Sequence, residues 1–231
     1  MFNKILNLVF PSKCPICEAD SDNRATNPIC ASCWQKIKKF TGPRCCICGL
    51  PVVSEFAGIC AACIQKRPDF EKIYYFGSYT GVIKKAVHLM KFSGIRRLAI
   101  PLSKLFDEIQ LPNVDVVMPV PLHRKKLLVR EFNQTAALAK YISKKIGARI
   151  AVSTLIKIKN TSAQTELSGT ERRKNLKKAF AVAEDLSGLK ILLVDDVITT
   201  GTTVAECARV LKKAGASEVH VAALARSLPK H

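Results

Sequence analysis

Two adjacent carboxylates, Asp195 and Asp196, stand within the stretch ILLVDDVITTGTT, which runs from Ile191 to Thr203. Carboxylates suit sugar hydroxyls and a hydrated hard cation such as Mg²⁺, whereas they repel a bare phosphate. The small hydroxyl residues that follow, in a loop around Gly201, can donate hydrogen bonds to an anion. The stretch therefore predicts a site for a sugar phosphate with free hydroxyl groups, in which the acidic pair acts on the sugar.

The residues around the acidic pair predict the elements that position it. The branched apolar run Ile191 to Val194 predicts a strand that is buried on both faces. Four later residues recur at helical spacing: Val204, Cys207, Leu211 and Ala214. Gly215 then predicts the end of that helix. A strand, a loop and a helix N-terminus in this order direct free backbone N–H groups and the positive end of the helix dipole at a bound anion.

This stretch resembles the thirteen-residue phosphoribosyl-diphosphate (PRPP) motif of type I phosphoribosyltransferases. The resemblance implies that Asp195 and Asp196 are catalytic and hold the ribose hydroxyls. It also implies a 5-phosphate loop that consists of Thr199, Thr200, Gly201, Thr202 and Thr203. The sequence contains neither GxxxxGK[ST] nor GxGxxG, which disfavours nucleoside triphosphate and dinucleotide sites. The structural alternative is an ordinary buried strand followed by a solvated turn.

Eight of the ten cysteines form four C-x-x-C pairs near the N-terminus. Twelve residues separate the first pair from the second, and eleven separate the third from the fourth. Each pair places two thiolates on one tight turn, and two pairs complete a tetrahedral zinc site with no open position. The predicted structural zinc ligands are Cys14, Cys17, Cys30, Cys33, Cys45, Cys48, Cys60 and Cys63. Tandem pairing is the simplest arrangement, and the spacing also allows cross-bracing of the first pair with the third.

Length and charge suggest how the chain is divided. Its 231 residues can form one main domain and a smaller module, and a polar boundary at 64–70 predicts a module at 1–68 and a domain at 69–231. The formal net charge is +19, of which +14 belongs to the larger region. Such a positive field suits a diphosphorylated sugar or nucleic acid, or serves only to keep the surface solvated.

The N-terminal stretch MFNKILNLVFP is too short and too interrupted for a secretory signal. No stretch reaches the ~18–20 apolar residues that a membrane span requires. These features predict a cytoplasmic protein, with peripheral association at the inner face of the cytoplasmic membrane as the alternative. They also favour zinc over disulfides, which need an oxidising compartment.

Hydrophobic periodicity predicts an alternation of strands and helices in the larger region. Strands are expected at 72–81, 114–120, 149–157, 177–182 and 218–225, of which the last closes the sheet. Helices are expected at 82–92, at 95–109, where Pro112 ends the helix, and at 130–146, where Gly147 ends it. This alternation predicts an α/β fold with a mostly parallel sheet flanked by helices.

The strand at 114–120 ends in the sequence PVPLHR, whose two prolines stiffen the following loop. The prolines leave the N–H groups of Val120 and Leu122 available to an anion. Ligands of open α/β sheets bind beyond the carboxyl ends of the strands, so this loop and the acidic stretch should share one crevice. The residues predicted to bind the pyrophosphate are Val120, Pro121, Leu122 and Arg124. The alternative is a basic surface turn.

A polar segment lies between 160 and 180 and shows no apolar period for most of its length. Long polar loops inside compact domains are usually functional or disordered. The residues predicted to form a lid are Gln164, Arg172, Arg173 and Asn175. Residues predicted to contact DNA are Arg124, Lys125, Lys126, Arg130, Arg173, Lys174 and Lys177. Aromatic residues are sparse near these cations, which argues against base stacking.

Several motifs together resemble the ComF family, which comprises ComF, ComFC and GntX-like proteins of bacterial natural competence. They are the C-x-x-C pairs, MKFSG at 90–94, PVPLHR at 119–124, REFNQ at 130–134, the spaced Gln/Arg/Asn pattern at 164–180 and LVDDVITTGTT. The resemblance implies a type I phosphoribosyltransferase fold behind a double zinc ribbon, with PRPP and Mg²⁺ as ligands. One position departs from the family pattern: Glu131 replaces the usual glycine and adds a negative charge near the predicted anion site.

Three functions are consistent with these observations. The favoured one is a PRPP-binding protein of natural competence that helps single-stranded DNA to enter the cytoplasm. The second is an active, amidophosphoribosyltransferase-like enzyme that releases pyrophosphate in nucleotide metabolism or salvage. The third is a zinc-ribbon adaptor that docks a helicase or a DNA-uptake channel. No residue pattern identifies an acceptor pocket or a general base.

Overall fold

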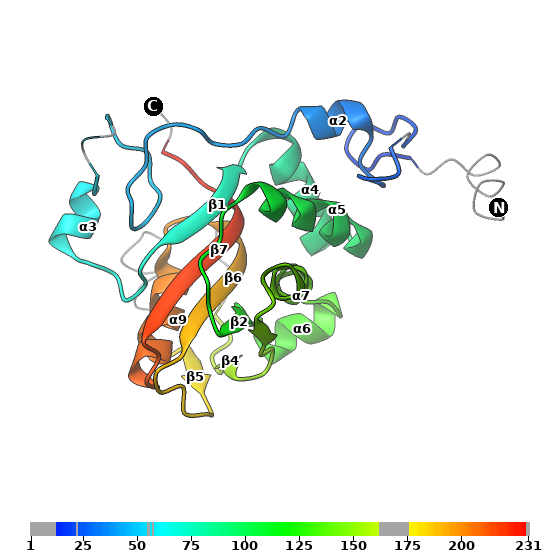
Figure 1. Ribbon diagram of the computed structural model, residues 1–231. Helices are drawn as coiled ribbons and strands as arrows, with labels where there is room; N and C mark the ends of the chain where they lie inside the picture. The colour runs from blue at the N-terminus through cyan, green and yellow to red at the C-terminus, as the bar shows by residue number, and fades with distance from the viewer. Residues whose placement is uncertain (1–12, 22, 55, 57, 162–175, 230–231) are drawn as a thin grey trace.

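A parallel sheet forms the centre of the computed structural model, which describes residues 13–21, 23–54, 56, 58–161 and 176–229 (Figure 1). The sheet has five strands in the order β1-β7-β6-β2-β3, and every pairing is parallel. Its strands are β1 (Ile73–Ser78), β2 (Val116–Pro119), β3 (Arg149–Ile150), β6 (Lys190–Ile198) and β7 (Glu218–Arg226). The predicted α/β class with a mostly parallel sheet is confirmed.

The central strands are buried on both faces, as their continuous apolar runs predict. Ile191 to Val194 of β6 are each 0 % exposed. β6 lies between β2 and β7, with Ile191 paired to Val116 on one side and to Val219 on the other. The prediction that the last strand closes the sheet is wrong. β7 is interior because β1 pairs along its other side, where Ile73 lies opposite Val221.

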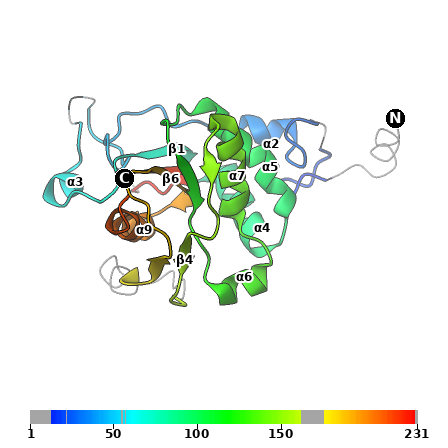
Figure 2. The ribbon, with the colours of Figure 1, turned by 60° about the horizontal axis from the view of Figure 1, so that its bottom comes forward.

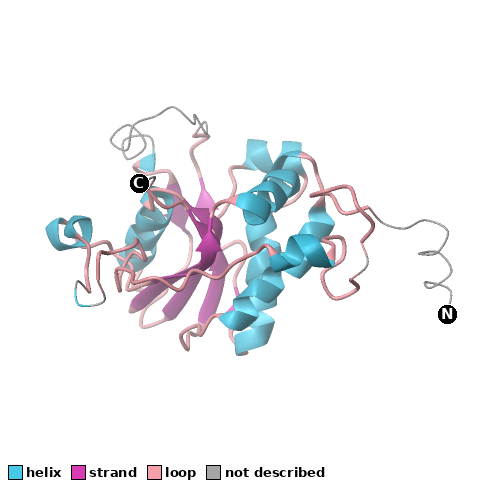
Figure 3. Cartoon of the chain, turned by 90° about the horizontal axis from the view of Figure 1, so that it is seen from above, coloured by secondary structure: helices cyan, strands magenta, loops and turns pink. Residues whose placement is uncertain are grey.

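Helices cover both faces of the sheet (Figure 2, Figure 3). One face carries α4 (Gly81–Phe92), α5 (Ala99–Ser103) and α7 (Gln134–Ile146), and the other carries α9 (Thr202–Lys213). The predicted inward stripe of α9 is confirmed for Val204, Cys207 and Leu211, which are buried. Among the described residues, no helix combines the length and apolar character needed to cross a bilayer.

The expected helix at 95–109 is wrong as a single element. The chain forms three short pieces instead, namely η2 (Arg96–Leu98), α5 and η3 (Lys104–Glu108), of which η2 and η3 are 3₁₀ helices. Pro101 is the physical reason. It has no N–H to donate to the carbonyl four residues earlier, and its ring clashes with that turn. An unbroken α-helix through Pro101 is therefore disfavoured.

The expected strand at 149–157 is divided between two sheets. β3 joins the main sheet, whereas β4 (Leu155–Lys157) pairs antiparallel with β5 (Phe180–Val182) in a separate two-stranded sheet. The chain bends between these strands at 152–154. Thr154 stabilises the bend, because its hydroxyl donates to Glu184 Oε1 at 2.9 Å while the residue is 3 % exposed.

The basic stretch after PVPLH is helical, so the alternative of a basic surface turn there is wrong. This helix, α6 (Arg124–Arg130), buries none of its residues. The helix expected from residue 130 begins instead at Gln134, because Glu131 adopts a left-handed conformation with φ 52° and ends α6. Asn133 then caps α7 by accepting a hydrogen bond from the Thr135 N–H at 3.2 Å. A local αL residue followed by an N-cap thus separates two helices.

The cysteine-rich segment lies along β1 and reaches both faces of the sheet. Its helices α2 (Ala31–Gln35) and α3 (Ala61–Gln65) lie on opposite sides of β1 in Figure 1. The chain between them follows the exposed edge of β1, where the Phe40 N–H donates to the Phe76 carbonyl at 2.8 Å. At Gly77 a Cβ atom would lie 2.5 Å from the Lys38 carbonyl oxygen, so the linker approaches β1 too closely for a side chain there.

Candidate functional site

The two carboxylates lie inside β6, near its carboxyl end, and they have different surroundings. Asp196 is 2 % exposed. Its Oδ1 accepts a bond from Lys91 Nζ at 2.6 Å, and its Oδ2 accepts one from Gln134 Nε2 at 2.8 Å. Both oxygens of Asp196 are therefore held by side chains from α4 and α7. This arrangement immobilises the carboxylate, since a buried charge is stable only when it is paired and hydrogen-bonded.

Lys91 is the cation that matches Asp196. Its ammonium is mostly buried, and burial by itself would lower the pKa of Lys91. The charges of Asp196 and Asp195 outweigh that effect and raise the pKa above its ordinary value. Lys91 therefore stays charged at neutral pH and ties α4 to β6.

Asp195 is partly exposed, and one of its carboxylate oxygens can still accept a ligand. One of its oxygens accepts the Asp196 N–H at 2.8 Å, and the other has no hydrogen-bond partner among the described residues. Burial raises the pKa of Asp195 to about 7; the charge of Asp196 adds to this shift, and Lys91 and Lys157 oppose it. A cation at this oxygen would favour the ionised form.

The loop after β6 leads directly into α9, as the sequence predicts. Thr199 and Thr200 are exposed, and Gly201 takes φ 79° at the helix N-cap. The hydroxyls of Thr200 and Thr202 lie 2.8 Å apart. The first N–H groups of an α-helix have no partner within the helix. The Thr202 N–H is directed at the Thr200 hydroxyl at 3.4 Å, and those of Thr203 and Val204 come next, before the Ala205 N–H bonds to the Gly201 carbonyl. Hydroxyls, N–H groups and the positive helix end together suit a phosphate.

The carboxyl end of β2 lies beside β6, because Pro119 pairs with Val194. The N–H of Val120 donates to the Val194 carbonyl at 2.8 Å, and its carbonyl accepts the Thr135 hydroxyl at 2.8 Å. The expectation that the Val120 N–H is available to an anion is therefore wrong: this residue extends the sheet. Pro121 and Leu122, which follow it, are partly exposed.

The predicted basic residues that the structure describes differ in their exposure and contacts. Arg124 and Lys125 are exposed on α6, and the Arg130 guanidinium lies 5.0 Å from the centre of the Phe92 ring. Lys126 Nζ donates to the Thr161 carbonyl at 3.0 Å, and Lys159 Nζ donates to that of Lys177 at 2.8 Å. The segment 157–161 therefore connects α6 to the start of β5. The four predicted lid residues lie outside the described residues: Gln164, Arg172, Arg173 and Asn175. So do two of the predicted DNA contacts, Arg173 and Lys174.

The structure also adds residues that the sequence interpretation did not assign to the site. Lys91 and Gln134 hold Asp196, and Lys157 acts on the charge of Asp195. The first two stand in MKFSG and REFNQ, which were matched to a family without a role for either side chain. Lys157 had no signal of its own, since it stands in a strand that the sequence alone does not place near β6.

Glu131 is paired with a cation and does not present a free charge to the predicted anion site. Its Oε2 accepts a bond from Arg96 Nη2 at 2.7 Å. Its φ of 52° lies in the left-handed region, which explains on physical grounds why glycine suits this position. The replacement therefore affects backbone strain, and its charge is paired at the surface.

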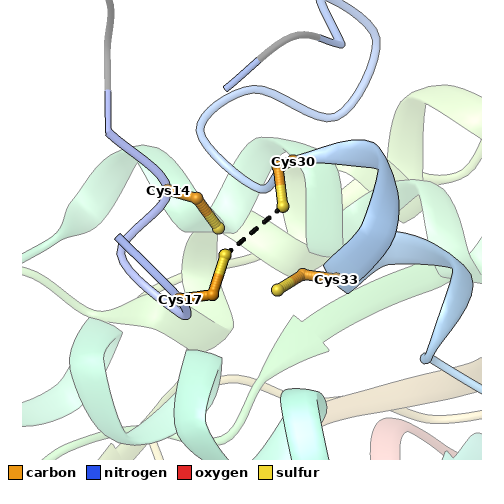
Figure 4. A group of neighbouring side chains, drawn as sticks. All are labelled: Cys14, Cys17, Cys30 and Cys33. Carbon is orange, nitrogen blue, oxygen red and sulfur yellow. Dashed lines mark hydrogen bonds between the residues drawn. The ribbon is translucent and has the colours of Figure 1, made fainter. Parts of the chain in front are cut away.

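The eight predicted zinc ligands form two separate tetrads, and the pairing is tandem. The first tetrad contains Cys14, Cys17, Cys30 and Cys33; the second contains Cys45, Cys48, Cys60 and Cys63. Within each tetrad the sulfur atoms all lie within 4.8 Å of one another. Figure 4 shows the first tetrad, in which the sulfurs of Cys17 and Cys30 are 3.5 Å apart. The cross-braced alternative is wrong, and Cys46 is exposed and belongs to neither tetrad.

The backbone of each first pair prepares a sulfur for metal binding. Burial opposes ionisation of Cys45, but hydrogen bonds from backbone groups of Cys48, Cys60 and Ile47 lower its pKa to about 6. The equivalent Cys14 is affected in the same way, and its pKa falls to about 7. Four converging sulfurs with a thiolate favoured in each group fit two structural Zn²⁺ ions, one held by each tetrad.

Known families match two parts of the chain. Residues 5–64 match the family described as "Double zinc ribbon domain", and residues 135–230 match "Phosphoribosyl transferase domain". The first match includes both tetrads. The second includes α7 except for its first residue, together with the acidic pair and the loop from Thr199 to Thr203. The two candidate sites of the structure thus fall in two different family regions.

Curated relatives extend over most of the chain. "DNA utilization protein YhgH" of Salmonella typhimurium is 32% identical over 210 residues, which cover 87% of this chain and 91% of the relative. "Competence protein F" of Haemophilus influenzae is 31% identical over 216 residues and covers 88% and 92%. The chain belongs to the ComF family. "Competence protein ComFC" of Bacillus subtilis is 28% identical and covers 86% of this chain and 84% of the relative.

Membership of the ComF family confirms the predicted combination of a double zinc ribbon with a phosphoribosyltransferase-type domain. Among solved structures, the glutamine PRPP amidotransferase from B. subtilis, complexed with ADP and GMP, is 23% identical, with a TM-score of 0.38. The match covers 53% of this chain and 25% of that enzyme, so the present chain spans about a quarter of its length.

Proposed function

We propose that this ComF-family protein binds PRPP together with Mg²⁺ in the crevice beyond β6 and β2. The observation that carries the proposal is that the two carboxylates of the acidic pair differ in their hydrogen bonding. Asp196 is fixed by Lys91 and Gln134, while Asp195 beside it keeps an oxygen without a protein partner among the described residues. A rigid acidic pair next to a helix N-terminus matches a ligand that carries hydroxyls on one side and phosphate on the other.

In this proposal each part of the crevice has one role. Asp195 accepts hydrogen bonds from the ribose hydroxyls. Asp196 positions the Asp195 carboxylate, because the backbone N–H of Asp196 donates to Asp195 Oδ1. The loop from Thr199 to Thr203 donates to the 5-phosphate, and Leu122 and Arg124 lie on the pyrophosphate side. Mg²⁺, when bound with PRPP, would neutralise part of the diphosphate charge. If the pyrophosphate leaves, the acidic pair stabilises the positive charge that develops on the ribosyl carbon.

Calorimetric titration with PRPP and Mg²⁺ tests the site. Asp195→Asn is expected to weaken binding at least about tenfold, since a hydrogen bond to a charged group contributes roughly 1.5–3 kcal/mol. The matched control is Asp69→Asn, an exposed carboxylate before the opposite, amino end of β1. Wild-type affinity in Asp195→Asn would refute the assignment, whereas equal loss in both variants would point to a general charge effect.

The pH dependence of the same titration provides a second test. Because the pKa of Asp195 is raised to about 7, its carboxyl is protonated below that pH and ionised above it. Affinity is therefore expected to rise with pH up to about 7, by at most about tenfold per pH unit, and then to level off. PRPP titrates identically with both proteins, so Asp195→Asn should lack this component. The free energy of unfolding should change in the opposite direction. Because the pKa of Asp195 is raised in the folded protein, wild type loses stability as pH rises from the ordinary Asp range toward 7, and Asp195→Asn does not.

Binding and transfer are separable. Release of pyrophosphate from PRPP in the presence of ammonia or nucleobases measures transfer, and calorimetry measures binding. An enzyme is expected to release pyrophosphate in an acceptor-dependent manner that Asp195→Asn abolishes. A binding protein is expected to retain PRPP affinity without acceptor-dependent release.

We also propose that α6 contacts single-stranded DNA, consistent with relatives that are named for competence and DNA utilisation. The supporting observation is that Arg124 and Lys125 are exposed on a helix that buries no residue. Arg124→Gln/Lys125→Gln should weaken binding to an oligonucleotide and reduce the salt slope by about 1.4, or ~0.7 for each charge lost. The control Lys66→Gln/Lys213→Gln removes the same charge from exposed positions elsewhere. Equal slopes in the two variants would contradict a role for α6.

A further inference from the structure

Arg226 is the feature of this fold that the proposed function does not use. It is the last residue of β7, and it pairs with Ser78 of β1 on one side and Ile198 of β6 on the other. The residue is 2 % exposed. Its Nε and Nη1 atoms are buried and have no hydrogen-bond partner in the part of the chain that the structure describes. An arginine at the end of a central strand, with two orphaned nitrogens, needs a physical explanation.

A guanidinium remains charged at all ordinary pH values, so Arg226 cannot become neutral in order to be buried. A buried charge without a partner costs several kcal/mol. Among the described residues, the buried charged side chains are Asp196 and Arg226, and the first has Lys91 as its partner. None of the ion pairs formed by the described residues includes Arg226.

The sheet places Arg226 on the side of the second tetrad. Ile198, its paired neighbour in β6, belongs to the buried cluster that also contains Cys45, Cys48, Cys63 and Tyr75. Burial lowers the pKa of Arg226, and the groups that oppose this shift are Cys48, Tyr75, Cys60 and Cys63. The Tyr75 hydroxyl donates to the Gly49 carbonyl at 2.8 Å, and the Ile73 N–H donates to the Ile47 carbonyl at 2.8 Å. The second tetrad is thus bound to β1 beside the guanidinium.

The charge of the second tetrad depends on whether zinc is bound. Without metal, one thiolate is favoured in this tetrad, at Cys45, whereas four thiolates around one Zn²⁺ carry a net charge of −2. Three of the four sulfur-bearing residues here, Cys45, Cys48 and Cys63, are buried, so water stabilises that charge poorly. The guanidinium and the zinc-thiolate group are each costly alone and compensate one another when both are present.

The first tetrad is held differently. The lysines that reach its ribbon donate to backbone carbonyls: Lys85 Nζ to Ile16 at 2.6 Å and Lys104 Nζ to Ala25 at 2.6 Å. Both lysines belong to the other face of the sheet. They remain partly in water and do not provide a buried charge beside the sulfurs. The two tetrads therefore differ in whether a buried cation lies beside them.

We propose that Arg226 is the counter-charge of the zinc group in the second tetrad, and that it couples retention of that zinc to the carboxyl end of β7. The coupling is reciprocal, because two groups that stabilise each other must do so equally in both directions. Loss of the second zinc reduces the negative charge beside the guanidinium, which lies between β1 and β6. Loss of the guanidinium leaves a buried dianionic group without its cation.

The test compares a variant that keeps the positive charge at position 226 with one that removes it, in the full-length, zinc-loaded protein. Zinc release to a chromogenic chelator is followed in Arg226→Lys and Arg226→Gln, and the freed cysteines are identified by alkylation and mass spectrometry. Arg226→Gln is expected to release zinc from the second tetrad about 10- to 100-fold faster, in the range seen for outer-shell partners of metal ligands. Arg226→Lys keeps the charge and should lie close to wild type. Release from the first tetrad should not change in either variant.

The matched control is Lys85→Gln, which removes a cation near the first tetrad and should leave release from the second unchanged. Equal release in Arg226→Lys and Arg226→Gln would overturn the proposal, because charge would then have no effect. So would acceleration at both tetrads.

Removal of zinc provides an independent test, namely the sign of the difference in melting temperature between Arg226→Met and wild type. In zinc-loaded protein Arg226→Met should melt below wild type, whereas after chelation the difference should vanish or reverse, because an apolar side chain then replaces an unpaired buried charge. A constant deficit with and without zinc would show that Arg226 acts through packing alone, and would refute the proposal. Hydrogen exchange near residues 224–228 should rise on chelation in wild type more than in Arg226→Met.

Discussion

The two zinc ribbons share their local structure but differ in what surrounds them. In each, the residue after the second cysteine has a positive φ, which is 66° at Glu18 and 73° at Gly49. In each, a five-residue helix starts directly after the third cysteine. The first tetrad belongs to the same buried cluster as Ile83 of α4, whereas the second belongs to the opposite cluster, which contains Tyr75 of β1. Local sequence thus builds the ligand geometry, and the docking face determines what else each ribbon must contain.

The αL position shows the consequence most directly. Glu18 is exposed, so a side chain has room despite the backbone strain. At Gly49 a Cβ atom would lie 2.7 Å from Tyr75 Cε1, which real contacts do not tolerate. The same turn therefore accepts glutamate where it faces water and requires glycine where it meets the sheet.

The largest expected effect comes from removing one ligand from each tetrad. Cys33→Ser and Cys63→Ser should each lose one of two zinc ions and several kcal/mol of folding free energy, because zinc binding contributes on the order of 10 kcal/mol in small zinc modules. Metal analysis measures the stoichiometry. Hydrogen exchange should rise in α4 for Cys33→Ser but in β1 and β7 for Cys63→Ser. Exchange that rises in the same elements for both variants would break the comparison.

The paired αL residues should respond in opposite directions. Gly49→Ala should lower the free energy of unfolding by about 2–4 kcal/mol, since backbone strain adds to the clash with Tyr75. Glu18→Gly should raise it by about 0.5–1 kcal/mol by relieving strain. Urea denaturation in excess zinc measures both. A similar cost for Gly49→Ala and Glu18→Ala would show that the docking face is unimportant.

A smaller effect is expected from the hydrogen bond between Tyr75 and the second ribbon. Tyr75→Phe leaves the Gly49 carbonyl without its partner and should cost roughly 1–1.5 kcal/mol. The neighbouring Tyr74→Phe is the control and should change the free energy of unfolding by less than about 0.5 kcal/mol. A full effect in the control would assign the loss to general packing of β1.

The smallest effect should come from the lysine contact with the first ribbon. Lys85→Met removes the bond to the Ile16 carbonyl and should cost about 0.5 kcal/mol, because the lysine is largely exposed. Lys84→Met on the same helix is the control and should be neutral. A loss as large as that of Tyr75→Phe would mean that both ribbons are held by comparably strong polar contacts.

The sequence alone determined those features that depend on neighbours in the chain. The buried run from Ile191 to Val194, the inward stripe of α9 and the ligand set of each tetrad follow from periods and spacings that act over a few residues. The ComF resemblance then predicted the fold class correctly. Local errors occurred where one residue changes the backbone, as Pro101 does within 95–109 and Glu131 does after α6.

Only the tertiary structure decided which charges meet. Lys91 and Asp196 are 105 positions apart, and their contact depends on how α4 packs against β6. The tandem ribbons reach opposite faces of the sheet because the linker crosses the edge of β1, which no spacing of cysteines encodes. Arg226 ends an apolar strand and in the sequence looks like an ordinary boundary residue. Its burial beside the second tetrad arises from three strands and a ribbon packed together, since the energy of a charge is set by its surroundings in space.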